Sequence, residues 1–212
     1  MEEIHREIKE YLRENWGIYS FITVLFILGV LIGALAVRGL EESQRFALNH
    51  YFSLFLDSFT ETGEWDQEAV FRQSLRLNFQ YLFLTWFCGI FIFGYPLIAG
   101  LTVLRGFSVG FTVGFLVERA SFRGILFAMG SVLPHNLLII PAFIVVTVTG
   151  FSFSWLRFCG RLEKRPASIR EHIGPYTMMT FLIGLVLFIG ILIEAYISPV
   201  FVRLLIPLMT GS

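Results

Sequence analysis

Charge is scarce in this chain. Only 15% of its 212 residues are Asp, Glu, Lys or Arg, whereas soluble domains carry about 25%. Hydrophobic residues reach 56% and the mean hydropathy is +0.73, so a water-soluble globular protein is excluded. Basic and acidic residues cancel at sixteen each, which argues against a nucleic-acid binder that relies on bulk positive charge. The composition therefore predicts an integral membrane protein.

Cysteine and histidine are also few. Cys88 and Cys159 are the only two cysteines, too few for a disulfide framework, and we interpret them as a small apolar side chain and a reduced thiol. The four histidines form neither an HExxH motif nor a Cys/His cluster. We therefore expect no metal site and no cofactor.

Long apolar runs indicate an all-α protein with about five transmembrane helices. The first run, 17–37, is long enough to cross about 30 Å of hydrocarbon. Residues 1–16 are polar with apolar residues at helical spacing, which predicts an amphipathic lead-in helix at the inner surface. Residues 17–212 then form one polytopic membrane domain. The expected spans are 17–37, 79–94, 97–117, 136–156 and 177–197.

The uncharged stretch 125–153 is too long for a simple crossing. Pro134 divides it, because the residue before a proline tends to leave the helical conformation. We expect residues 122–133 to form a short re-entrant or interfacial helix before the fourth span.

The distribution of Lys and Arg predicts the orientation. Basic residues are denser in the lead-in and in the loop 157–176 than in the remaining loops. This bias places the N-terminus and the loop 157–176 inside, and the loop 38–78 and the C-terminus outside. The outer loop is rich in aromatics, so we expect interfacial helices there. Its candidates for docking a partner are Phe52, Phe55 and Phe59.

A G-x-S-x-G pattern around Ser108 is typical of serine hydrolases, but that motif needs a sharp strand-to-helix turn. Here it lies within an apolar helix, where small residues four apart let two helix backbones approach closely. We therefore interpret the glycines as packing residues and expect no catalytic residue. The packing set is Gly29, Gly33, Gly106, Gly110 and Gly114.

Two ionisable residues fall within predicted spans and a third lies at the start of one, where an unpartnered charge is costly. Arg105 either extends its side chain towards the inner headgroups or pairs within the bundle. His135 and Glu194 are expected at similar depth near the outer side, and with Asn136 they would form a buried polar clasp.

Three motifs in order resemble the stage II sporulation protein M family. They are GFSVGFTVGF at 106–115, SVLPHNLLIIP at 131–141 and EAYISP at 194–199. The broader family tends to show P-H-G-x-x-E-x-P, whereas this chain has Asn136 and Ile139 in place of the glycine and the glutamate. That departure resembles the sporulation branch.

The resemblance implies a non-enzymatic scaffold in the cell membrane, at the sporulation septum and the engulfing membrane. Its implied partners are stage II sporulation proteins D and P, which degrade peptidoglycan during septal thinning and engulfment of the forespore. The lipid bilayer is the other expected partner, and homo-oligomerisation is left open. The alternative function is a subunit of a transporter or channel that uses Arg105, His135 and Glu194.

Overall fold

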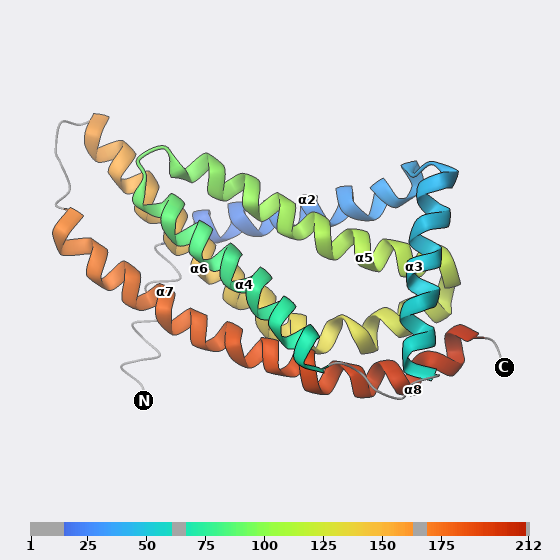
Figure 1. The fold of residues 1–212 in the computed structure, drawn as a ribbon. Coiled ribbons are helices and arrows are strands. Elements are labelled where there is room, and N and C mark those ends of the chain that lie inside the picture. The colour runs from blue at the N-terminus through green and yellow to red at the C-terminus, as the bar shows by residue number, and fades with distance from the viewer. Residues whose placement is uncertain (1–14, 61–66, 163–168, 211–212) are drawn as a thin grey trace.

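A computed structural model describes residues 15–60, 67–162 and 169–210. The described residues are almost entirely helical and contain no strand, which confirms the predicted all-α fold. The elements, labelled in Figure 1 where there is room, are α2 (Trp16–Ala36), η1 (Val37–Gly39), α3 (Glu42–Thr60), α4 (Gln67–Ile90), α5 (Gly94–Ser131), α6 (Leu133–Leu162), α7 (Ile169–Leu192), the π-helical η2 (Ile193–Ile197) and α8 (Ser198–Thr210).

The helices form an elongated bundle with two distinct ends. Helices α2 and α5 run side by side, and α4, α6 and α7 pack alongside them (Figure 1). At one end, here called the α3 end, α3 lies across the bundle and α8 continues the line of α7. The opposite end, here called the Gly94 end, holds the turn between α4 and α5. Helix α3 and the Gly94 turn, which the sequence assigns to opposite sides of the membrane, thus lie at opposite ends of the bundle.

Four helical stretches are long and apolar enough to cross a membrane. They are Trp16–Gly39, Gly94–Ser131, Leu133–Gly160 and Ile173–Ile206. Many of their large apolar side chains point outward, as expected of a surface that faces lipid. The chain is therefore an integral membrane protein, whereas the predicted count of five spans is not confirmed.

Helix α4 accounts for the difference in span count. It contains most of the expected span 79–94 but begins at Gln67, within the expected outer loop 38–78. That loop is therefore shorter than predicted. The first half of α4 buries the polar residues Ser74 and Asn78 inside the bundle. These two side chains face other helices, whereas the charged residues of this half, such as Glu68 and Arg72, are exposed.

The predicted break near Pro134 is present. Helix α5 is interrupted at Ser121, whose φ of 48° lies in the left-handed region, and the chain turns back there (Figure 1). Gly124 makes this turn tight, because a Cβ atom there would overlap the backbone of Leu116. A short helical segment follows and ends at Ser131, and Val132 separates it from α6.

The helices α2 and α5 touch through the glycines that the sequence singles out. A Cβ atom added at Gly29 or Gly33 would collide with the backbone of α5, and one added at Gly106, Gly110 or Gly114 would collide with the backbone of α2. Such close approach gives the dispersion contacts that hold helices together in lipid.

Gly110→Leu tests this contact. The leucine side chain would meet the backbone of Val30, with its Cα and carbonyl carbon 2.7 Å from the new Cβ. We expect the free energy of unfolding in detergent to fall by about 1–3 kcal/mol or more. Gly100→Leu on the same helix is the matched control, because nothing lies within 4 Å of its Cβ position. Equal stability of the two variants would contradict the close contact.

Candidate functional site

A chain of hydrogen bonds links two charged residues in the middle of the bundle. Arg105 Nη2 donates to Asn78 Oδ1 at 2.8 Å. Asn78 Nδ2 in turn donates to Ser74 Oγ at 3.2 Å, and the Ser74 hydroxyl donates to Glu194 Oε2. Every donor in this chain points from the cation towards the carboxylate, so each bond polarises the next. We call these four residues the polar relay.

Tyr81 completes the environment of Arg105. The guanidinium carbon lies 5.3 Å from the centre of the tyrosine ring, within the range of a cation–π interaction. Arg105 is therefore held inside the bundle by α4, from which both Asn78 and Tyr81 come. Arg105 therefore points into the bundle, but its hydrogen-bond partner is a neutral amide and it forms no direct ion pair among the described residues.

The π-helix η2 presents Glu194 to the relay. It inserts between α7 and α8, and π-helical turns of this kind occur often at functional sites. Its neighbour Ala195 is fully buried, which anchors the turn against the bundle. Ser198, just beyond η2, is also buried and reaches α6.

His135 and Asn136 lie at the start of α6 beside the relay. Asn136 Nδ2 donates to the carbonyl of Val132 at 2.8 Å and lies 3.0 Å from His135 Nε2. This makes Nε2 an acceptor, so the proton of the neutral ring is on Nδ1. His135 Nδ1 therefore donates to Ser198 Oγ at 3.1 Å.

Two neighbouring cavities surround these groups. The first, of about 300 Å³, is lined by both ends of the relay and by His135 and Asn136. The second, also of about 300 Å³, extends towards Phe55 of α3 and Val202 of α8. Ser74, Leu77, His135 and Glu194 line both cavities.

The structure brings the three residues of the predicted clasp to one place, but not through the expected bond. His135 contacts Asn136, whereas Glu194 bonds with Ser74, and no hydrogen bond joins His135 to Glu194 among the described residues. Sequence reasoning missed Ser74 and Asn78 because it placed them in the outer loop. The available signal was their spacing of four residues, which puts both on one face of a helix.

Ser108 lies within a regular helical part of α5 and lines the first cavity. Its hydroxyl donates to the carbonyl of Leu104, one turn earlier, at 3.1 Å. This is the usual bond of a serine in a membrane helix. The residues that the structure describes hold no group of three or more His, Cys, Asp or Glu side chains placed to bind a metal.

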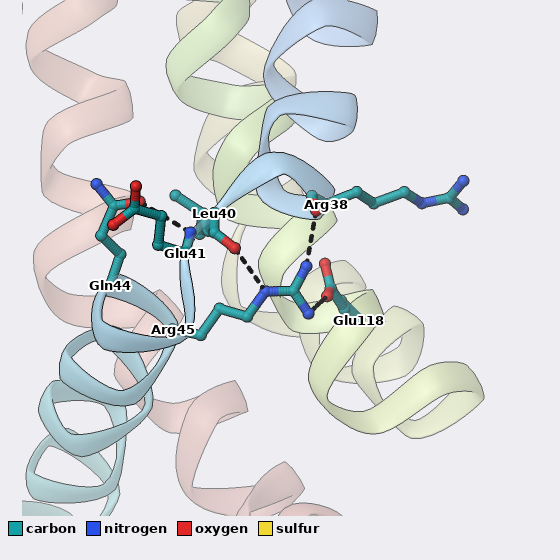
Figure 2. A network of polar contacts seen from close by, with 6 residues as sticks. All are labelled: Arg38, Leu40, Glu41, Gln44, Arg45 and Glu118. Atoms are coloured by element: carbon teal, nitrogen blue, oxygen red, sulfur yellow. Dashed lines mark hydrogen bonds and ion pairs between the residues drawn. The ribbon is translucent and has the colours of Figure 1, made fainter.

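Arg45 fixes α3 across the end of the bundle. As Figure 2 shows, its guanidinium forms an ion pair with Glu118 at 2.6 Å and donates to the carbonyls of Arg38 and Leu40. Arg119 of α5 adds bonds to the carbonyl and side chain of Asn49 at 3.0 Å. The end of η1, the start of α3 and the middle of α5 thus meet at this corner, and α3 is a docked helix.

The aromatic residues of α3 divide between two faces, and two of the three predicted docking candidates pack on the inner one. Phe52 packs edge-on against Phe115 and Phe127 and beneath Arg119, and Phe55 packs against the same core. Both therefore stabilise the fold. The third candidate, Phe59, has a side chain outside the described part of the structure. Among its described side chains, the large apolar ones that α3 exposes are Phe46, Tyr51 and Leu54.

These features define a polytopic helical membrane protein with a buried polar centre and a helix docked across one end. The family model for stage II sporulation protein M matches residues 22–199, and the chain belongs to that family. Membership implies a role in sporulation. No curated protein and no solved structure matches the chain significantly.

Asn78→Leu tests the polar relay. The substitution keeps the side-chain volume but removes the acceptor for Arg105 and the donor to Ser74. We expect the free energy of unfolding to fall by about 1.5–3 kcal/mol, the usual contribution of a hydrogen bond to a charged group. Gln80→Leu, an exposed position on the same helix, should change it by less than about 0.5 kcal/mol.

A second substitution in the relay distinguishes lost pairing from lost packing. Adding Arg105→Met to Asn78→Leu removes the stranded charge, so the double variant should recover part of the lost stability. A double variant less stable than Asn78→Leu alone would contradict the relay.

Proposed function

We propose that this protein is a non-enzymatic membrane scaffold that anchors peptidoglycan-degrading partners at the sporulation septum. The partners are stage II sporulation proteins D and P, and the process served is septal thinning and engulfment of the forespore. Family membership supports the role in sporulation. The observation that supports a scaffold most strongly is the docked α3 helix with its exposed aromatic residues.

The outer surface of α3 has the properties of a partner-binding face. Phe46 and Tyr51 are 76% and 70% exposed, and Leu54 is exposed beside them. Phe46 stacks on His50 one turn later, and His50 contacts Tyr51. We call Phe46, His50, Tyr51 and Leu54 the α3 face. Aromatic residues are enriched in protein interfaces and lose little conformational entropy on binding.

The anchoring of α3 suits this role. A partner bound to α3 is anchored to the membrane only if α3 stays attached to the bundle. The Arg45–Glu118 ion pair and the bonds from Arg119 supply that attachment (Figure 2). A preformed face also avoids the entropic cost of ordering a loop when the partner binds.

Replacing Phe46 and Tyr51 together by Ser tests the proposal. Each buried aromatic at an interface contributes about 1–2 kcal/mol or more, so partner recovery with the protein from sporulating membranes should fall by about tenfold or more. The abundance of the protein in the membrane should not change, because both side chains leave the core intact.

Phe93→Ser is the matched control, since Phe93 is 65% exposed at the Gly94 end. It should leave partner recovery unchanged. Undiminished recovery with the double variant would show that the α3 face rests on lipid headgroups instead. Cleavage of peptidoglycan by the purified protein alone would contradict the non-enzymatic role.

A further inference from the structure

Arg105 and Glu194 carry opposite charges in one cavity without forming a direct ion pair. Asn78 and Ser74 stand between them in the polar relay. Within the described part of the chain, Arg105 uses one of its five donors and Glu194 accepts one hydrogen bond. The remaining donors and acceptors of both groups are available to the cavity that they line.

In the part of the chain that the structure describes, the relay leaves polar atoms of both charged groups without a hydrogen bond. Charged groups buried in a membrane protein are normally paired with one another, because the pair avoids most of the loss of hydration. Here the relay gives a hydrogen bond to one atom of Arg105 and to one atom of Glu194. Two further polar groups that line the cavity, His135 and Asn136, bond chiefly to each other, to Ser198 and to the backbone.

The cavity also opens on the side of the bundle. Ser108 and Thr112 line it, and both are exposed. Ser108 lies about 21 Å along α5 from Gly94, at 1.5 Å per residue, and the straight part of the helix is about 40 Å long up to Ser121. The opening is therefore within the transmembrane region, where lipid is the neighbour. Apolar residues, among them Leu77, Val109 and Val132, line the rest of the wall.

We propose that this cavity is a binding site for a zwitterion that carries an anionic phosphate or carboxylate and a primary ammonium group. The anion binds the free edge of the Arg105 guanidinium, and the ammonium donates to the carboxylate of Glu194. A volume of about 300 Å³ holds such a group. This site lies apart from the α3 face and is independent of the scaffold proposal.

Two sources supply this chemistry: the ethanolamine headgroup of a phospholipid, and a small free zwitterion. The test measures the thermal unfolding midpoint of the delipidated full chain in detergent, because a ligand that binds the folded state raises the midpoint. The probes are short-chain phosphatidylethanolamine, phosphatidylcholine and phosphatidylglycerol, together with free phosphoethanolamine and alanine.

We expect a raised midpoint with phosphatidylethanolamine and no comparable response to the other two lipids. The choline headgroup has no N–H to donate to Glu194, and the glycerol headgroup has no cation. A response to phosphatidylethanolamine alone identifies a lipid ligand. A response shared with phosphoethanolamine or alanine identifies a soluble zwitterion. Either result supports the site, whereas equal responses to all three lipids, or none to any probe, would overturn it.

Variants assign the response to the cavity. Glu194→Gln keeps an acceptor for Ser74 but removes the charge, and Arg105→Gln removes the opposite charge. Each should weaken binding by about tenfold or more. The matched controls are Glu68→Gln and Arg72→Gln, an exposed ion pair on α4, and they should bind as the original chain does. Unchanged binding by folded Glu194→Gln would refute the proposal even if Arg105→Gln failed to fold.

Discussion

The need to satisfy charges inside a membrane protein shapes the centre of this bundle. Arg105 and Glu194 lie on helices that cross the apolar region, and neither is tolerated there without polar partners. Helix α4 supplies those partners through Ser74 and Asn78. This explains why a helix of mixed polarity lies among four strongly apolar ones. It also explains why η2 departs from regular helical geometry at Glu194, the residue that the relay must reach.

The α2–α5 contact and the α3 end are packed in different ways. Helices α2 and α5 approach through glycines and contact backbone to backbone. At the α3 end, a cluster of large side chains that includes Leu56, Phe127 and Val202 joins α3 to α5 and α8. Arg45 and Arg119 then fix α3 through polar bonds. The tight glycine contact gives a rigid frame, and the α3 end adds a helix whose outer face is free of the core.

The sequence was sufficient for the features that depend on local pattern. Apolar runs predicted the membrane helices, Pro134 predicted a break that the structure has at Val132, and the glycine spacing pointed to residues that lie between α2 and α5. Features that depend on how the helices pack against one another could not be predicted from the sequence. The inward face of α3 resembles its outward face in composition, so Phe52 was mistaken for a surface residue. Ser74 and Asn78 look like loop residues until α4 is placed beside Arg105.

The most direct test of the scaffold account is the side of the membrane on which α3 lies, since peptidoglycan and its hydrolases are outside. In a chain with Cys88 and Cys159 replaced, Tyr51→Cys and Phe93→Cys place single thiols at exposed positions of the α3 end and the Gly94 end. The account predicts that a membrane-impermeant maleimide labels Tyr51→Cys in intact cells and labels Phe93→Cys only after the membrane is opened. Labelling of Phe93→Cys but not Tyr51→Cys in intact cells would contradict it.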